Sequence, residues 1–362
     1  MTETIDLGQP ALLGSDLPLA SGYDLALLDL DGVVYIGKDA VPGAASALDA
    51  VRGSGVPVRF VTNNASRPAQ VVADLLTGLG VPATVAEVVT SAQVAAALLA
   101  RRLPPGSGVL VVGAAGLRDA LTEQGLVPMA SVDEGPAAVV QGFGPDVGWR
   151  LLAEATRAVR SGLYWMATNL DLTVPTPYGP GPGNGTLVQV VATAAGRGPD
   201  EVAGKPRPGA FLEAARQAGS SRPLVVGDRL DTDLEGARAA GMHGLLVLTG
   251  VTGVTELLAA STKERPDYVG DDLHALLAPH PAARLVTPEQ AECAGAVARV
   301  DTRGVAGPAV RVVQAGTDPV ALLRAAAVAS WAYQDAGGRQ PLDPTDLLAA
   351  VQALGGAAGW AR

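Results

Sequence analysis

The sequence predicts an α/β fold built on parallel sheets, and three observations favour it. Short apolar runs alternate with segments of helical periodicity. Strands that are buried on both faces of a parallel sheet read as such continuous apolar runs. Several runs end directly in acidic or hydroxyl residues, and parallel sheets bind ligands beyond the carboxyl ends of their strands. About 140 residues separate two of these polar clusters, too many for one connection, which indicates an inserted second domain.

The elements follow from the apolar pattern in chain order. The expected strands are 25–30, 58–62, 109–113, 137–143, 163–167, 224–227 and 245–248. The expected helices are 44–52, 69–79, 116–124, 149–161, 210–217 and 234–240. Segment 175–185 is dense in Pro and Gly and predicts a long loop.

The last part of the chain follows a different pattern. The alternation resets at 278–281, and we expect short strands within 296–313 and helices at 321–333 and 346–354. A small α/β module is the simplest interpretation. It could mediate dimerisation or regulation, or cover a sheet edge, and the sequence leaves these alternatives open.

Composition excludes several classes of partner. The 362 residues carry a net charge of -10, which argues against general nucleic-acid binding because that binding relies on Lys and Arg at phosphates. No apolar run reaches about 18 residues, so no membrane span is expected. Cys293 is the one cysteine, and the N-terminus has no basic region followed by an apolar core. We therefore expect a cytoplasmic protein.

The first polar cluster is the Asp-x-Asp-Gly sequence after the first strand. Asp29 and Asp31 would point to the same side if the strand continued through both. Two like charges there are costly unless a cation or a shared proton relieves them. Gly32 would let the backbone turn away sharply. A solvated turn is the alternative interpretation of the dipeptide alone.

Two further clusters suit an anion. Thr62, Asn63 and Asn64 follow the second strand, and hydroxyl and backbone N–H groups at such a position suit a phosphate. Taken alone, this cluster is better explained by ordinary helix capping. Lys205 is one of three lysines in a chain whose default cation is arginine, and its compact charge suits a phosphoryl oxygen.

The fourth cluster is acidic and follows the strand 224–227. Asp228 stands at the strand end and is a candidate metal ligand. Asp233 stands at an expected helix start, where it could complement the helix dipole. Together the four clusters predict a phosphoryl-transfer site with Mg²⁺.

The same stretches resemble the four motifs of the haloacid dehalogenase superfamily. The stretches are "DLDGVVY" (29–35), "FVTNN" (60–64), "GKPRPG" (204–209) and "GDRLDTD" (227–233). Segment 166–188 is similar to the cap of the NagD-like, p-nitrophenylphosphatase branch. Within that branch the sequence most resembles glycerol-3-phosphate and phosphoglycolate phosphatases. The resemblance covers residues 20–280 and implies a Rossmann-like doubly wound core with an inserted α/β cap of the C2 type.

The resemblance also implies a role for each site residue. Asp29 would be the nucleophile that forms an aspartyl-phosphate, and Asp31 the general acid and base. The Mg²⁺ ligands would be the Asp29 and Asp228 carboxylates and the Asp31 backbone carbonyl. Asp233 would have a supporting role. The phosphoryl group would be held by the remaining polar residues, namely Thr62, Asn63, Asn64 and Lys205.

We expect three parts in the chain. A discontinuous core would comprise residues 1–81 and 203–282, a cap residues 82–202, and an extension of unassigned role residues 283–362. The substrate would be a small phosphorylated metabolite, with glycerol 3-phosphate favoured by the resemblance. Phosphoglycolate, sugar phosphates and nucleotides are alternatives. A phospho-signalling receiver or a catalytically silent binding protein is the alternative of a different class.

Overall fold

The computed structural model describes residues 10–176, 178–304 and 307–361. The chain forms two compact units. Unit 1 comprises Met1–Val58 and Ser220–Arg362, and unit 2 comprises Arg59–Gly219. Each contains parallel strands and helices, so the predicted α/β class is confirmed. The division into core, cap and extension stays a prediction.

Unit 1 contains four neighbouring parallel strands. Their order is β16 (Tyr268–Gly270), β15 (His243–Val247), β14 (Pro223–Gly227) and β2 (Leu25–Leu28). All four residues of β2 are buried, as a continuous apolar run requires. Because β2 and β14 are parallel neighbours, the residues that follow each of them emerge at the same edge.

Unit 1 also contains a short strand pair and several helices. They are the antiparallel pair β3 (Tyr35–Ile36) and β4 (Asp39–Ala40) and the helices α1 (Ala44–Gly53), α8 (Glu235–Ala239) and α9 (Val254–Ala259).

Unit 2 contains a five-stranded parallel sheet. Its order is β13 (Glu201–Val202), β10 (Tyr164–Ala167), β9 (Ala138–Gln141), β7 (Gly108–Val112) and β8 (Val127–Met129). A second parallel pair is β5 (Val58–Thr62), which starts at the unit boundary, and β6 (Val88–Thr90).

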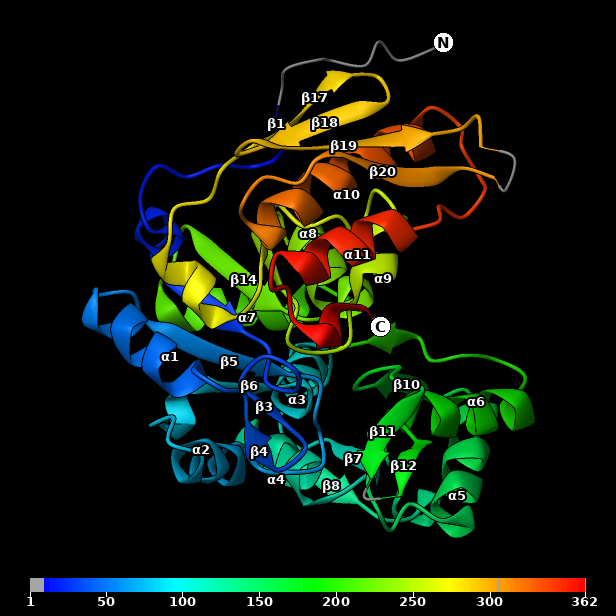
Figure 1. Ribbon diagram of the computed structural model, residues 1–362. Helices are drawn as coiled ribbons and strands as arrows, with labels where there is room; N and C mark the ends of the chain where they lie inside the picture. The colour runs from blue at the N-terminus through cyan, green and yellow to red at the C-terminus, as the bar shows by residue number, and fades with distance from the viewer. Residues whose placement is uncertain (1–9, 177, 305–306, 362) are drawn as a thin grey trace. The chain divides into compact units, whose positions relative to one another are not determined.

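Helices complete unit 2. They are α2 (Ala69–Gly78), α3 (Ser91–Arg102), α4 (Ala115–Glu123), α5 (Trp149–Arg160), α6 (Asn184–Ala195) and α7 (Gly209–Ala218). Helices α5 and α6 lie side by side (Figure 1), and their apolar residues share one core with β7, β9 and β10.

The Pro- and Gly-rich segment is a hairpin, so the predicted loop is wrong over most of its length. β11 (Thr173–Thr176) pairs antiparallel with β12 (Gly179–Pro182). The two strands form an isolated sheet. Proline can be accommodated there because each strand has one side without a ladder partner that needs its N–H.

The C-terminal region forms the expected α/β module. Strands β17 (Ala283–Thr287), β18 (Gln290–Cys293), β19 (Ala296–Asp301) and β20 (Ala309–Gln314) form an antiparallel sheet, extended at one edge by β1 (Pro10–Leu12).

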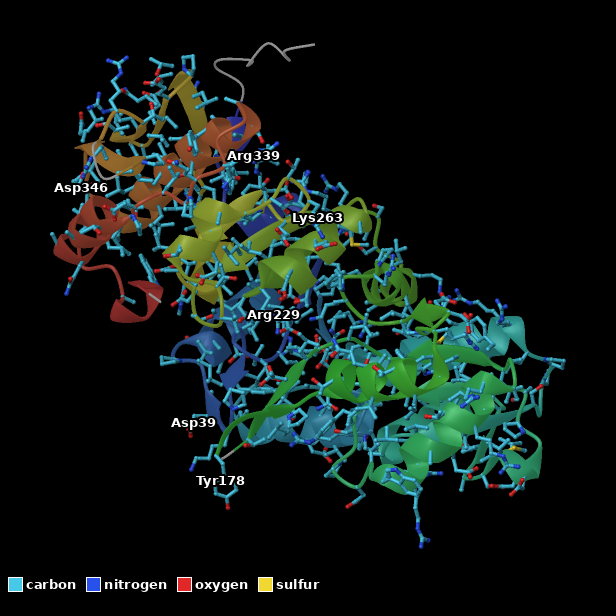
Figure 2. All side chains as sticks on the ribbon, turned by 90° about the vertical axis from the view of Figure 1, so that its right-hand side faces the viewer. Asp39, Tyr178, Arg229, Lys263, Arg339 and Asp346 are labelled. Carbon is cyan, nitrogen blue, oxygen red and sulfur yellow. The ribbon has the colours of Figure 1, made fainter. Side chains whose placement is uncertain are left out.

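Two helices accompany this sheet, and α10 (Pro319–Asp335) lies along it (Figure 1). Asp318 caps α10 by accepting from the Val320 N–H (2.8 Å). Asp346 of α11 (Thr345–Ala353), labelled in Figure 2, accepts from the Val312 N–H of β20 (2.9 Å).

The module shares a hydrophobic core with the parallel strands of unit 1. Residues of α10 and β17–β20 cluster with Leu246 of β15, Val269 of β16 and Leu257 of α9. The Trp331 indole N–H donates to the Leu257 carbonyl (2.9 Å). The module therefore covers these elements.

A buried arginine and histidine join the module to β16. Arg324 of α10 donates from Nε to the Val269 carbonyl (2.9 Å) and from Nη2 to Nδ1 of His280 (2.7 Å). The His280 ring lies 2.8 Å from the Ala275 carbonyl through Nε2, which must donate, so Nδ1 is the acceptor and the ring is neutral. Burial first, and then Arg324, lower the pKa of His280 from 6.5 to about 4.

This histidine predicts an acid-sensitive fold. Unfolded His280 takes up a proton below about pH 6.5, whereas the folded ring, only 2% exposed, does not until about pH 4. Its contribution is therefore present above pH 6.5 and is lost as the pH falls towards 4, which amounts to about 3 kcal/mol of unfolding free energy. Urea unfolding at several pH values measures this slope. We expect His280→Gln to flatten it, and equal slopes would contradict the assignment.

None of the helices within the described ranges combines the length and the apolar character that a membrane-spanning helix needs.

Candidate active site

Three carboxylates meet at the edge where β2 and β14 end. Asp29 follows β2, and its N–H donates to the Val226 carbonyl (2.9 Å), which continues the pairing with β14. Asp228 follows β14, and Asp233 lies in the helical turn before α8. Oxygens of these three side chains all lie within 4.8 Å of one another, and all three residues are buried.

Glycines allow this close approach. A Cβ on Gly250 would lie 1.9 Å from Oδ2 of Asp228, and one on Gly32 would lie 2.3 Å from the same oxygen. Gly32 also has a φ of +81°, so it makes the turn predicted after Asp31. A Cβ on Gly227 would lie 2.2 Å from that of Asp233. The backbone is therefore shaped around the carboxylates.

Backbone N–H groups hold the carboxylates of Asp228 and Asp233 in place. Oδ2 of Asp228 accepts from the Val251 N–H (2.6 Å), and Oδ2 of Asp233 accepts from the Arg229 N–H (3.2 Å). The Arg229 guanidinium itself pairs with Asp231 (2.8 Å) and is labelled in Figure 2. Buried carboxylates at this separation repel by roughly 3 kcal/mol per pair at an effective dielectric constant of 20. A divalent cation would turn this repulsion into attraction.

Asp31 differs from the expectation of a continuing strand. β2 ends at Leu28, and Asp31 is exposed in the following turn, where the Gly32 N–H donates to the Tyr35 carbonyl (2.8 Å). Its side chain is not among the three clustered carboxylates. Asp233, expected only to support the site, is one of the three.

A second polar cluster lies in unit 2, where β5 ends. The Thr62 hydroxyl accepts from the Asn64 N–H (3.1 Å). Oδ1 of Asn64 accepts from the Ser66 N–H (2.8 Å) and the Ser66 hydroxyl (3.0 Å). The Asn64 side chain is thus a turn element. Ser66 does not cap α2, whose N-cap position is Pro68 without a side-chain hydrogen bond.

Lys205 belongs to this second cluster. It is 3% exposed, its Nζ donates to the Val61 carbonyl (3.0 Å), and it lies 5.9 Å from the centroid of the Phe211 ring. Asn63 contacts the Lys205 backbone through two hydrogen bonds of 2.9 and 3.1 Å. The structure thus joins the Thr62–Asn63 and Lys205 motifs, which lie 142 residues apart.

Sequence reasoning missed Ser91. Its hydroxyl donates to the Asn63 carbonyl (2.6 Å). The signal was available, since Val88–Thr90 is an apolar strand that ends in hydroxyl residues, like the other strands that carry the site.

Comparisons with known proteins identify the family of the chain. The model of the haloacid dehalogenase-like hydrolases matches residues 26–127, and a related HAD-hydrolase-like model matches residues 202–276. D-glycerol 3-phosphate phosphatase of Mycobacterium tuberculosis is 47% identical over 258 residues, which are 71% of this chain and 72% of the relative. Acid sugar phosphatase of Staphylococcus aureus is 35% identical over 71% of this chain and 97% of its own length.

Solved structures extend the likeness. The crystal structure of glycerol phosphate phosphatase from M. tuberculosis with magnesium has a TM-score of 0.79 and 41% identity, covering 94% of this chain and 99% of its own. Residues 1–282 are only 282/362, or about 78%, of this chain, so that match extends into the C-terminal module. A 4-nitrophenylphosphatase from Thermotoga maritima has a TM-score of 0.67 and 31% identity, covering 72% of this chain and 98% of its own. This chain belongs to the haloacid dehalogenase-like hydrolase family.

Proposed function

We propose that the protein is a Mg²⁺-dependent phosphomonoesterase whose substrate is glycerol 3-phosphate. The observation that carries the proposal is the buried group of Asp29, Asp228 and Asp233 at the carboxyl edge of parallel strands. The choice of glycerol 3-phosphate as substrate is supported by the M. tuberculosis relative, which is named for that ester. The acid sugar phosphatase relative makes a sugar phosphate the second candidate.

The residues present fit a magnesium ion. Carboxylate oxygens are the donors that Mg²⁺ prefers, and these are held close by glycines that leave no room for another side chain. We assign the ligands to the Asp29 and Asp228 carboxylates and the Asp31 carbonyl, with Asp233 in support. When bound, Mg²⁺ would offset the charge of the carboxylates and of the phosphate.

The first chemical step uses two aspartates. A carboxylate oxygen of Asp29 attacks the phosphorus, and the bond from phosphorus to the ester oxygen breaks. Asp31 donates its proton to the departing alkoxide, which leaves as an alcohol. The exposed position of Asp31 suits a group that exchanges protons with substrate and water.

The second step hydrolyses the aspartyl-phosphate. Asp31, now ionised, takes a proton from a water molecule whose oxygen attacks the phosphorus. Inorganic phosphate leaves, and both aspartates return to their starting states. We assign Lys205, the Thr62 hydroxyl and the backbone N–H of residue 63 to the phosphoryl oxygens. The Asn64 N–H donates to the Thr62 hydroxyl and so orients it. Without the positive charges of Mg²⁺ and Lys205, a carboxylate and a phosphate dianion about 4 Å apart would repel by roughly 8 kcal/mol at an effective dielectric constant of 20.

We also propose a domain arrangement, a location and an assembly for this enzyme. Residues 82–202 would be a cap inserted between the two core segments, 1–81 and 203–282, and would select the substrate. A small phosphorylated metabolite is the partner, and nucleic acid is not. The single cysteine favours the cytoplasm. A homodimer through residues 283–362 is the assembly to test.

Phosphate release from a panel of esters tests the proposal. The panel contains glycerol 3-phosphate, 2-phosphoglycolate, a hexose phosphate and a nucleoside monophosphate, each with Mg²⁺ and with EDTA. We expect multiple turnovers with Mg²⁺, a fall of about 100-fold or more in EDTA, and recovery when Mg²⁺ is restored. The highest kcat/KM should belong to glycerol 3-phosphate. A hexose phosphate in first place would favour the second candidate, and no turnover at all would favour a receiver or a silent binder.

A further inference from the structure

The Asn63 side chain is fully committed to protein partners in unit 2. Its Oδ1 accepts from the Lys205 N–H (2.9 Å), and its Nδ2 donates to the Lys205 carbonyl (3.1 Å). The second hydrogen of Nδ2 is directed to the Asp171 carboxylate, 3.2 Å from Oδ2 and 3.4 Å from Oδ1. The amide therefore forms hydrogen bonds with both the N–H and the carbonyl of Lys205, as a residue of a neighbouring strand would.

Asp171 sets the orientation of this amide. An ionised carboxylate only accepts hydrogen bonds, so it requires the NH₂ end of Asn63 on its side. That orientation places Oδ1 against the Lys205 N–H. The only capacity left on the amide is a lone pair of Oδ1. A lone pair cannot bind an ionised phosphate oxygen, which is itself an acceptor.

The surrounding backbone supports these hydrogen bonds between Asn63 and Lys205. The Asn63 carbonyl accepts from the Ser91 hydroxyl (2.6 Å) and from Nδ2 of Asn169 (2.7 Å). A Cβ on Gly204 would lie 2.5 Å from Oδ1 of Asn63, so only glycine before Lys205 lets the amide reach that backbone. Both ends of the contact are thus fixed.

We infer that Asn63 is a positioning residue that holds the Lys205 backbone, with Asp171 as its orienting partner, and that its side chain does not bind phosphate. The inference rests on the proposed function only where it makes Lys205 the group that is positioned for catalysis. Anchoring its backbone limits where the buried Nζ can lie. Displacement of a catalytic group by about 1 Å can cost about 100-fold in rate.

The chain offers a direct probe, because Lys38, Lys205 and Lys263 are its only lysines. Protein labelled with ¹³C at lysine gives one side-chain signal for each, and Lys205→Arg identifies the signal of Lys205. The full-length protein is studied without substrate, so this readout is independent of turnover. The signals of Lys38 and Lys263 report that a variant is folded.

The key variant is Asn63→Asp. Its second oxygen would face the Lys205 carbonyl and the Asp171 carboxylate, so we expect the Lys205 signal to move and kcat to fall by about 100-fold. Adding Asp171→Asn supplies an amide donor for the new carboxylate. It should recover about tenfold of that loss and return the signal towards its wild-type position. Asn63→Ala, which should also move the signal, replaces Asn63→Asp if the latter does not fold.

Asn64→Asp is the matched control, because it adds the same charge one residue away. Oδ1 of Asn64 only accepts hydrogen bonds, so a carboxylate can take its place. The Lys205 signal should then stay in its wild-type position. An unmoved Lys205 signal in Asn63→Asp and Asn63→Ala would overturn the inference. So would a fall in kcat of Asn63→Asp that the added Asp171→Asn does not relieve. Absence of turnover in the wild type would overturn the proposed function instead and leave the Lys205 signal as the test.

Discussion

Replacing Asp29 by asparagine is expected to abolish turnover and to weaken the stabilisation of the fold by Mg²⁺. The amide matches the carboxylate in size, so the buried site at 8% exposure keeps its packing. It lacks the anionic oxygen that attacks phosphorus, and loss of a nucleophile typically costs about 10⁴-fold or more in kcat. It also removes one of three clustered carboxylates, which reduces the charge available to a cation.

Two measurements on the same samples check this. Phosphate release with saturating Mg²⁺ measures turnover. Thermal unfolding over a series of Mg²⁺ concentrations measures the stabilisation, because an ion that binds only the folded state raises Tm as its concentration rises. We expect a large rise of Tm in the wild type and a clearly smaller one in Asp29→Asn.

Asp231→Asn is the control for charge. Asp231 lies between Asp228 and Asp233 in sequence, is 59% exposed in its side chain and pairs with Arg229 outside the cluster. It should keep both turnover and the Mg²⁺ response. Turnover above about 1% of wild type in Asp29→Asn would remove Asp29 from the role of nucleophile.

The acidic edge of unit 1 could be predicted because its causes are local. An apolar strand that ends in an acid places that acid at the sheet edge, and this is visible for Asp29 and Asp228 in the sequence alone. Asp233 was harder to place. Its approach to the others depends on the π-helical turn Leu230–Leu234 and on the missing side chain of Gly227, neither of which has a periodic signature.

Contacts between distant segments could not be predicted. The hydrogen bonds between Asn63 and Lys205 join residues 142 positions apart. The motif around Asn63 alone suggested that this residue binds phosphate. The hairpin at 173–182 was hidden by its proline and glycine content, which favours a loop in any local estimate.

One missed helix did carry a readable signal. The Thr90 side chain accepts from the Gln93 N–H (3.2 Å), and Gln93 accepts from the Thr90 N–H (2.9 Å). This is a capping box at the start of α3. The strand before it, Val88–Thr90, has only three residues and is too short to stand out as an apolar run, so the strand-to-helix boundary is not marked by the apolar pattern.

Adding a single methyl group at Gly250 is expected to weaken the metal site although no ligand residue is replaced. A Cβ there would lie 1.9 Å from Oδ2 of Asp228, 2.4 Å from its Cγ and 2.7 Å from its Cβ. Because the Asp228 Cβ is also too close, a change of rotamer cannot relieve the clash, and the backbone must shift. The φ of Gly250 is not in the left-handed region, so alanine meets no strain of its own there. The effect of Gly250→Ala is therefore steric and is directed at Asp228.

The expected loss is in Mg²⁺ affinity first. Disturbing the groups that orient a metal ligand typically weakens metal binding by about 10- to 100-fold. The forced shift should also lower the unfolding free energy by about 1–3 kcal/mol. The Mg²⁺ concentration that gives half-maximal phosphate release measures the first effect, and urea unfolding in EDTA measures the second.

Gly53→Ala is the matched control, because Gly53 ends α1 with nothing within 4 Å of its added Cβ. It should leave the Mg²⁺ requirement unchanged and keep or slightly raise stability. If Gly250→Ala needs no more Mg²⁺ than the wild type, the close approach of Gly250 to Asp228 has no part in metal binding, and the assignment of Asp228 as a ligand loses its structural support.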